Sequence, residues 1–289
     1  MDTALPSLSP SALADLLGRP DAPLLLDVRR RERFAASDRL LPAALHCAPE
    51  DIAGFAARER PRDVIVYCAY GHEVGCEAAR TLRLAGWNAR YLLGGIEAGE
   101  NGVDRLQDIA AWRSAPLPTI RKRADLGVTG ERPSRWITRE RPKIDRIACP
   151  WLILRFIDPR AKFFYVPEAQ LVEHARELAA TPFDVHGAPV THEWERCSFD
   201  AVLHAFDLHM PALDRLADIV RGADTLRFGL TGPAAGLLAI SLGLSRVYRD
   251  DQAMLRAALP LYDALYAWCR DGEQETHDWP SHEPQGTSA

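Results

Sequence analysis

The sequence predicts an α/β region built on a parallel sheet, followed by a mainly helical α+β region. In residues 1–112, short apolar runs alternate with helical patterns, as in the strand–helix–strand units of parallel sheets. Residues 113–134 contain three prolines and two glycines. They show neither a helical nor a strand period, which predicts a linker. Amphipathic helical patterns dominate residues 135–272. The polar residues 273–289 predict a disordered tail.

The first region is predicted to contain three strands and two helices in its central part. The apolar run 23–28 and the β-branched run 63–68 are typical of buried parallel strands. Between them, residues 48–59 have a helical period. The segment after residue 68 places apolar residues on one helix face and ends before Gly86. A further strand is predicted over 89–93, before two glycines.

The second region is predicted to combine two short strands, over 162–166 and 189–194, with several helices. Pro150 indicates the first residue of an apolar helix, because proline suits the first helical position. Ala148 or Cys149 would then be the cap. The other predicted helices span 168–180, 198–208, 211–223 and 250–272.

Composition limits the partners and the compartment. The net charge of −5 and the pI near 6.0 argue against general nucleic-acid binding. The longest apolar run, 234–244, is too short to span a bilayer, so we expect no membrane partner. The N-terminus has no secretory pattern, and six cysteines occur without a CxxC pair. We therefore predict a cytoplasmic protein with reduced thiols.

Cys68 is the first candidate catalytic residue. It ends a predicted central strand in the stretch CAYGHEV, directly before a helix. A helix N-terminus favours a thiolate and an anionic substrate. Gly71 lets the loop turn back over the sulfur, and His72 can supply a hydrogen-bond donor. The competing interpretation is that Cys68 is a small buried core residue.

Residues 8–112 resemble the rhodanese family of sulfurtransferases. The resemblance rests on LLLDVRRRERF, LLPAALH, VIVYCAYGHEV, AARTLRLAGW and YLLGGIEAG, in that order. It implies a rhodanese-like parallel sheet with flanking helices. It also implies that Cys68 takes a sulfane sulfur from a small donor, holds it as a persulfide, and passes it to an acceptor thiol. Asp27 and Arg29 match the Asp-Val-Arg of the family, which orders the fold around the site. This chemistry requires no cofactor.

Glu73 departs from the family pattern. The family loop often carries an arginine five residues after the cysteine, where this chain has Glu73. A carboxylate there would repel a dianion such as thiosulfate. The YGHEV variant resembles rhodanese-like proteins that accompany chromate-resistance genes, which implies glutathione-type donors and acceptors instead.

In the second region, basic residues indicate an oxyanion site. Residues 132–146 hold six basic residues against two acidic ones, in an acidic protein. Arg139 and Arg146 could bind a small oxyanion through their guanidinium groups, with Arg221 at the edge of the same pocket. The basic residues could equally form a solvated strand face.

A metal site is the second hypothesis for this region. His192 and Cys197 lie in a predicted strand-to-helix turn, and His plus Cys with carboxylates can ligate a first-row metal. The candidate ligand set is Asp145, Cys149, His192, Cys197 and Asp224. The spacing matches no standard zinc signature, and a hydrogen-bonded structural histidine and a packed cysteine remain alternatives.

Residues 135–272 resemble the C-terminal domain of the ChrB family of chromate-resistance proteins. The matching segments are RWITRERPKIDRIACPWLILRFIDP, FDVHGAPVTHEWERCSFD, IVRGADT, GLLAISLGL and LYDALYAWCR. The resemblance implies a role in chromate resistance, by sensing the oxyanion or supporting its detoxification. Two functions therefore stay open: a persulfide-forming sulfurtransferase fused to a chromate-resistance domain, and a non-enzymatic sensor of chromate or metal whose first domain only binds.

Overall fold

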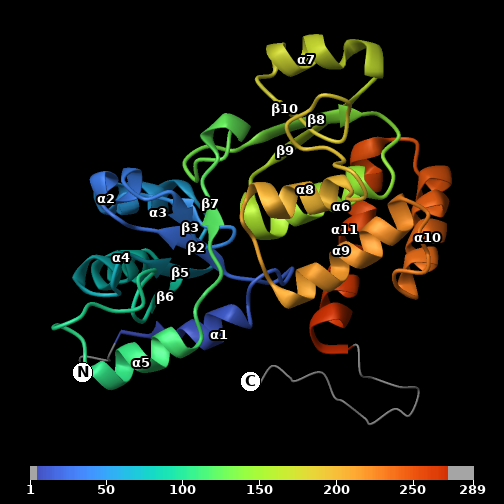
Figure 1. Ribbon diagram of the computed structural model, residues 1–289. Coiled ribbons are helices and arrows are strands. Elements are labelled where there is room, and N and C mark those ends of the chain that lie inside the picture. The colour runs from blue at the N-terminus through green and yellow to red at the C-terminus, as the bar shows by residue number, and fades with distance from the viewer. Residues whose placement is uncertain (1–4, 273–289) are drawn as a thin grey trace.

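The computed structural model describes residues 5–272 and contains a parallel sheet region and a largely helical region (Figure 1). The predicted fold class is confirmed in both parts. We call residues 5–112 the N-terminal region, residues 113–134 the connecting segment, and residues 135–272 the C-terminal region. The predicted tail, 273–289, lies outside the described residues.

The N-terminal region is built on five parallel strands in the order β1-β6-β5-β2-β4. Their bounds are Ser7–Leu8 (β1), Leu24–Asp27 (β2), Leu45–His46 (β4), Asp63–Tyr67 (β5) and Asn88–Leu92 (β6). β5 lies at the centre, and its residues 64–67 are fully buried. Because ligands bind at the carboxyl ends of parallel strands, the residue after β5 occupies the usual site position.

Helices cover both faces of this sheet. Their bounds are Pro10–Ala14 (α1), Arg31–Ala35 (α2), Ile52–Arg58 (α3), Glu73–Leu84 (α4) and Leu106–Ser114 (α5), with a 3₁₀ turn η1 at Pro49–Asp51. One buried cluster joins Ile52 of α3 and Leu82 of α4 to the sheet, and a second joins Leu13 of α1 to the opposite face. Because α4 packs against the sheet in the first of these clusters, its position relative to β5 is fixed.

The C-terminal region has a small parallel sheet in the order β10-β8-β9. The strands are Arg135–Arg139 (β8), Lys162–Val166 (β9) and Thr181–Pro182 (β10). The strand predicted over 189–194 was wrong. These residues form a loop with isolated bridges from Val190 to Phe183 and from Glu193 to Arg196. Trp194 has a φ of +57°, which turns the chain back on itself and ends any extended run.

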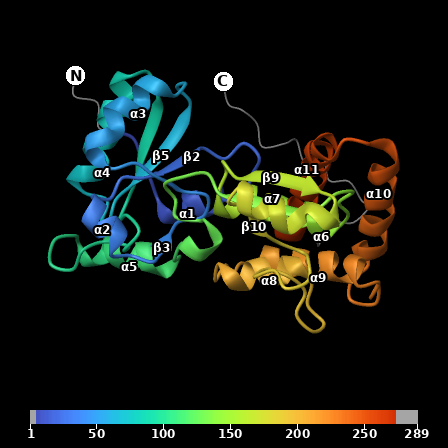
Figure 2. The ribbon, with the colours of Figure 1, turned by 90° about the horizontal axis from the view of Figure 1, so that it is seen from above.

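Helices form most of the C-terminal region. Their bounds are Asp145–Leu152 (α6), Leu171–Glu177 (α7), Ser198–Ala205 (α8), Pro211–Asp224 (α9), Pro233–Val247 (α10) and Asp251–Ala267 (α11). Two π-helical turns extend α6 and α11, η3 at Ile153–Ile157 and η5 at Trp268–Gly272, and a 3₁₀ turn η4 at Glu168–Gln170 precedes α7. α10, expected only as an apolar run, lies at the outer end of the region (Figure 2).

Pro150 lies inside α6, so the predicted helix start at Pro150 was wrong. Proline lacks the N–H that would bond the carbonyl four residues earlier, here that of Arg146. The hydroxyl of Tyr165 donates to this carbonyl instead, at 3.1 Å. The hydroxyl of Tyr165, in β9, therefore replaces the missing helical hydrogen bond. The helix begins at Asp145.

The connecting segment contacts both regions. Its strand β7 (Ile120–Arg121) pairs with β3 (Arg39–Leu40) of the N-terminal region, and a 3₁₀ turn η2 follows at Ala124–Leu126. Leu40 is fully buried in the core cluster of the C-terminal region. Arg39 also forms a 2.6 Å ion pair with Asp207, between the two regions. Within residues 5–272, no helix has both the length and the apolar character needed to cross a bilayer.

Candidate functional sites

Cys68 follows β5 directly and precedes the first turn of α4. Its Sγ accepts a hydrogen bond from the N–H of Gly71 at 3.3 Å. Its carbonyl accepts from the N–H of Ile96 at 3.1 Å, which ties the loop to the segment after β6. The residue is 6% exposed. The loop 68–72 thus curves around the sulfur and presents the Gly71 N–H to it.

Gly71 makes this curvature possible. Gly71 has a φ of +78°, and a Cβ there would lie 2.7 Å from the backbone of Leu92 and Gly94. Gly71 therefore needs glycine both for its backbone conformation and for its close approach to the next loop.

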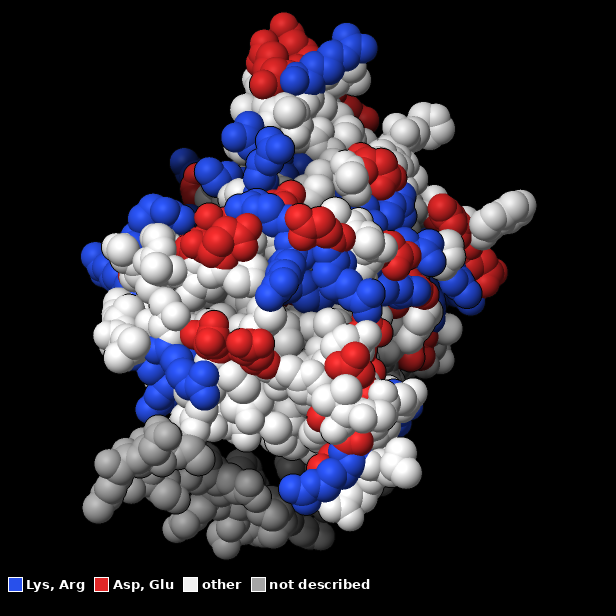
Figure 3. Space-filling view, turned by 90° about the vertical axis from the view of Figure 1, so that its left-hand side faces the viewer, with Lys and Arg blue, Asp and Glu red and all other residues white. Residues whose placement is uncertain are grey.

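The sulfur faces a cavity of about 430 Å³. The lining residues are Arg29, Arg30, Arg33, Cys68, Ala69, Tyr70, His72, Glu73 and Val74. On the rim, Arg33 donates to the hydroxyl of Tyr70 at 3.3 Å and lies 3.5 Å from Glu97. On the side formed by the N-terminal region, Lys and Arg are intermingled with Asp and Glu over much of the surface (Figure 3). Charge selection at Cys68 must therefore come from the cavity itself.

His72 is the N-cap residue of α4, and its ring is oriented by acidic residues. Its Nε2 lies 3.0 Å from the carboxylate of Asp104, and its Nδ1 lies 3.5 Å from Glu100. Asp104 in turn accepts the N–H of Glu100 at 2.7 Å. The pKa of Asp104 is lowered, because its bonds to Glu100 and His72 outweigh the effect of burial, which raises it. Sequence reasoning missed both acidic partners, which lie in a loop without a motif.

Asp27 and Arg29 lie together beneath the same cavity. The Arg29 guanidinium donates to both carboxylate oxygens of Asp27, at 2.6 and 3.0 Å, and both side chains are buried. Arg29 Nη2 also donates to the carbonyl of Arg39 at 2.8 Å. His46 donates from Nε2 to the carbonyl of Arg29 at 3.0 Å. This pair fixes the end of β2 against β3 and β4, and thereby one wall of the site.

The C-terminal region brings three carboxylates around one imidazole. His192 Nε2 lies 3.3 Å from Asp145 Oδ2, 3.3 Å from Asp184 Oδ1 and 3.2 Å from Asp224 Oδ2. Asp145 begins α6, Asp224 ends α9, and the other two lie in the loop between β10 and α8. Ligand atoms of Asp145, Asp184 and His192 all lie within 4.8 Å of one another.

The electrostatics of this cluster are strongly perturbed. Burial raises the pKa of Asp145 to about 7, with Asp224 and Asp184 adding repulsion and His192 opposing it. The pKa of His192 is raised to about 12 by Asp145, Asp184 and Asp224, although burial lowers it. The carboxylates therefore stabilise a positive charge at their centre.

Arg139 and Arg146 lie at the same cluster, whereas Arg221 does not. Arg139 and Arg146 line a cavity of about 450 Å³ that also exposes Asp184, His192 and Asp224. Arg146 Nε lies 3.3 Å from Asp184. Burial lowers the pKa of Arg146 below its ordinary value. Arg221 instead pairs with Asp200 at 2.7 Å and with Asp218, and it lines a different cavity.

The two predicted cysteine ligands contribute no ligand atom to the Asp145–Asp184–His192 group. Cys149 is fully buried, and burial raises its pKa far above the ordinary thiol value. Cys197 is also fully buried, with its pKa raised by burial, and it caps α8. Both therefore act as apolar packing residues in the core cluster.

Sequence reasoning missed two residues of this site, Asp184 and Ser198. Ser198 donates its hydroxyl to Asp184 Oδ1 at 2.7 Å and its N–H to Asp145 Oδ2. Asp184 has a φ of +50°, which is uncommon for a residue other than glycine. The only signal available in the sequence was the FDVHG segment, in which Asp184 stands two residues from a histidine.

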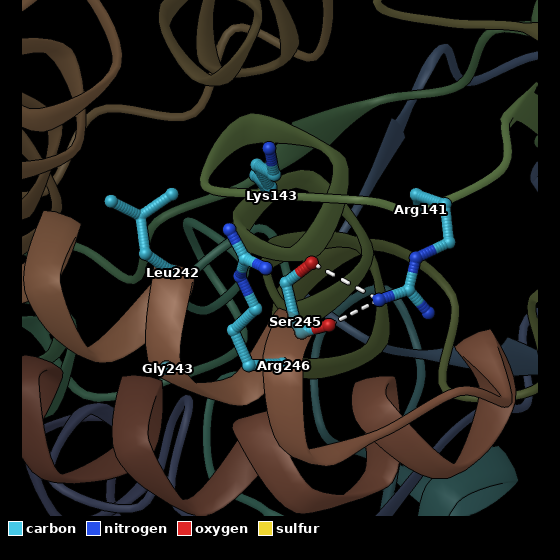
Figure 4. Close-up of a pocket in the computed structure, with 6 residues that line it drawn as sticks. All are labelled: Arg141, Lys143, Leu242, Gly243, Ser245 and Arg246. Atoms are coloured by element: carbon cyan, nitrogen blue, oxygen red, sulfur yellow. Dashed lines mark hydrogen bonds between the residues drawn. The ribbon is translucent and has the colours of Figure 1, made fainter.

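A larger cavity, of about 540 Å³, lies between residues 141–143 and α10 (Figure 4). There Arg141 donates to the hydroxyl of Ser245 at 3.2 Å and to its carbonyl, and further to the carbonyl of Tyr248 at 2.9 Å. These are carbonyls at the end of α10, so Arg141 acts as a cap for that helix. The contacts of Arg141 in this cavity are therefore explained by helix capping.

Each region matches one family model of known proteins. Residues 9–101 match the family model of the rhodanese-like domain, and residues 136–269 match that of the ChrB C-terminal domain. Protein ChrB of Cupriavidus metallidurans is 34% identical over 152 residues, which are 48% of this chain. This chain spans about 45% of the length of that relative.

Two of the solved structures similar to this chain are a rhodanese homologue and a rhodanese-like domain. A rhodanese homologue from Thermus thermophilus is 29% identical, with 32% of this chain and 96% of the homologue covered and a TM-score of 0.26. The rhodanese-like domain of an Anabaena protein is 30% identical, with 39% and 77% covered and a TM-score of 0.30.

Proposed function

We propose that this fusion of a rhodanese-like domain with a ChrB C-terminal domain is a sulfurtransferase that carries sulfur on Cys68. The observation that carries the proposal is the position of Cys68 Sγ. It accepts the Gly71 N–H at 3.3 Å, lies before the first turn of α4, and faces a cavity of about 430 Å³. The Gly71 N–H and the N-terminus of α4 would stabilise a bound persulfide.

The proposed reaction has two displacement steps. The Cys68 thiolate attacks the sulfane sulfur of a donor persulfide, forming a Cys68 persulfide and releasing the donor as a thiolate. An acceptor thiolate then attacks the outer sulfur, forming the acceptor persulfide and restoring the Cys68 thiolate. No net oxidation occurs and no cofactor is needed. We expect glutathione-type thiols as donor and acceptor, in a reducing cytoplasm.

The experiment is an intact-mass measurement of the purified full chain after incubation with glutathione persulfide. We expect the wild type and the Cys76→Ser variant to gain one sulfur atom, and the Cys68→Ser variant to gain none. Cys76 is a matched control, because it is a partly buried thiol on α4. Equal gain in the Cys68→Ser variant would remove Cys68 from the reaction.

We further propose that the ChrB-type domain binds an oxyanion such as chromate, which would connect the fusion to chromate resistance. The support is the placement of Arg139, Lys143 and Arg146 around one cavity of about 450 Å³. Arg139 Nε is buried and lacks a hydrogen-bond partner among residues 5–272. An oxyanion would supply the missing acceptor, and guanidinium groups suit such ligands.

Calorimetry of the full chain with chromate tests this second proposal. We expect Arg139→Gln to weaken binding by about tenfold or more, the cost of one lost charge-assisted hydrogen bond. Arg135→Gln is the matched control, because Arg135 lies on the same strand β8 but bonds the carbonyl of Leu178. Equal affinity of both variants, or no binding by the wild type, would contradict the proposal.

A further inference from the structure

We infer that Asp145, Asp184 and His192 form a binding site for one first-row divalent cation, with Asp224 as a fourth contact. The inference is independent of sulfur transfer at Cys68, and its site opens to the same cavity as the proposed oxyanion site. It rests on the geometry around His192 Nε2 and on one buried carboxylate oxygen.

The first argument concerns the proton that the imidazole can offer. Nε2 carries at most one hydrogen, yet three carboxylate oxygens lie 3.2–3.3 Å from it. A charge-assisted N–H···O bond is about 2.7–2.9 Å long. One proton therefore cannot satisfy three carboxylates at these distances. A divalent cation between the four groups would interact with all of them at once.

The second argument is an unpartnered polar atom. Asp145 is 1% exposed, and its Oδ1 has no hydrogen-bond partner among the described residues, whereas its Oδ2 accepts the N–H of Ser198. A buried carboxylate oxygen without a partner is costly, and an absent ion is a recognised reason for one. The oxygen of Asp145 that faces His192 is Oδ2, so a cation bound by both carboxylate oxygens of Asp145 would satisfy this atom.

The third argument is the spacing of the ligand atoms. Metal–ligand bonds to nitrogen and oxygen are about 2.1 Å long. Neighbouring ligands then lie about 3.0 Å apart in an octahedron and about 3.4 Å apart in a tetrahedron. The separations of 3.2–3.3 Å between His192 Nε2 and the three oxygens fall within this range. Ligand atoms of Asp145, Asp184 and His192 lie within 4.8 Å of one another, so these three residues can contact one ion.

The surroundings supply an outer shell and an open side. Ser198 holds Asp184 with its hydroxyl and Asp145 with its N–H, and Arg146 lies 3.3 Å from the other oxygen of Asp184. Such partners orient ligating carboxylates. Asp184, His192 and Asp224 line the cavity of about 450 Å³, so solvent or a small ligand can reach the ion.

The donor set indicates the class of cation. One imidazole with two or three carboxylates suits Mn²⁺, Fe²⁺ or Zn²⁺, whereas the soft Cu⁺ ion prefers thiolates. Cys149 and Cys197 are not in the ligand group, so the site differs from a cysteine-based zinc site.

The test is calorimetric titration of the chelator-treated full chain with Mn²⁺ and, separately, with Zn²⁺. We expect one ion per chain for at least one metal, with affinity lowered about 100-fold or more by His192→Ala and by Asp145→Asn. His192 is on an exposed loop, so its variant should fold even if the Asp145 variant does not. The control is Asp214→Asn, an exposed carboxylate on α9. Failure of both metals to bind, or wild-type affinity in the His192→Ala variant, would overturn the inference.

Discussion

The hydroxyl of Ser198 donates to Oδ1 of Asp184 at 2.7 Å, and the backbone N–H of the same residue donates to Oδ2 of Asp145. Ser198 is fully buried at the start of α8. Asp145 begins α6 and Asp184 follows β10, so one serine orients carboxylates from two distant segments. The proposed metal ligands are therefore held before any ion binds.

Ser198→Ala should weaken Mn²⁺ or Zn²⁺ binding by about 10–100-fold, the usual effect of losing a partner that orients a ligand. The backbone N–H and its bond to Asp145 remain in this variant, so the helix start should be preserved. Calorimetry measures the affinity. Ser245→Ala is the control, because the Ser245 hydroxyl contacts Arg141 and lies in another cavity. Equal losses in both variants would contradict a specific role for Ser198.

The parallel sheet and the Cys68 site could be predicted because their signals are local. The runs that form β2 and β5 are mostly apolar, and the run that forms β6 precedes two glycines. The cysteine, the glycine and the helix start fall within one short segment. His72 was expected to supply a donor to the site. Its orientation by Asp104 was not predictable, because the two residues are 32 positions apart and no period connects them.

The metal cluster was only partly predictable, for a physical reason. His192, Asp145 and Asp224 were candidates because each stands beside a predicted helix end or loop, but their proximity depends on how α6 and α9 pack. The cysteines were included because thiols are common ligands, yet both point into an apolar core. Asp184 carried no sequence signal beyond its neighbouring histidine.

Gly71→Ala should abolish sulfur loading of Cys68 and lower the free energy of unfolding by about 3 kcal/mol or more. The new Cβ would lie 2.7 Å from backbone atoms of Leu92 and Gly94, which cannot move without breaking the loop. Gly102→Ala is a matched control: its φ of +83° is similar, but no atom lies within 4 Å of its Cβ. The Gly102→Ala variant should lower the free energy of unfolding by only about 1–2 kcal/mol and should leave sulfur loading of Cys68 intact. Denaturant unfolding and intact mass measure the two effects, and equal behaviour of the variants would contradict the role of the close approach.

Glu73→Gln should raise kcat/KM for thiosulfate by about fivefold, because a carboxylate in the cavity repels a dianion. The change keeps the size of the side chain and the start of α4. Glu77→Gln, an exposed carboxylate one turn further along α4, should have a much smaller effect. A steady-state assay with thiosulfate at low ionic strength gives the comparison. An unchanged kcat/KM in Glu73→Gln would mean that this carboxylate does not select the donor.

Leu40→Ala should lower the free energy of unfolding by about 2–5 kcal/mol, the usual cost of a cavity in a packed core. Leu40 belongs to β3 of the N-terminal region, yet it is fully buried in the core cluster of the C-terminal region. Its loss should therefore weaken the attachment of the two regions as well as the core. Leu84→Ala, at a residue that is 91% exposed, should change stability by less than about 0.5 kcal/mol.

The same pair of variants tests whether the two regions unfold together. β3 pairs with β7, and Arg39 bonds Asp207 at 2.6 Å, so the attachment rests on backbone pairing, burial and an ion pair at one place. Fluorescence and circular dichroism should give one coincident transition in the wild type and in Leu84→Ala. In Leu40→Ala the two probes should separate, because the shared core that couples the regions has been opened. Coincident transitions in Leu40→Ala, at wild-type stability, would show that the regions are joined mainly by contacts other than this buried leucine.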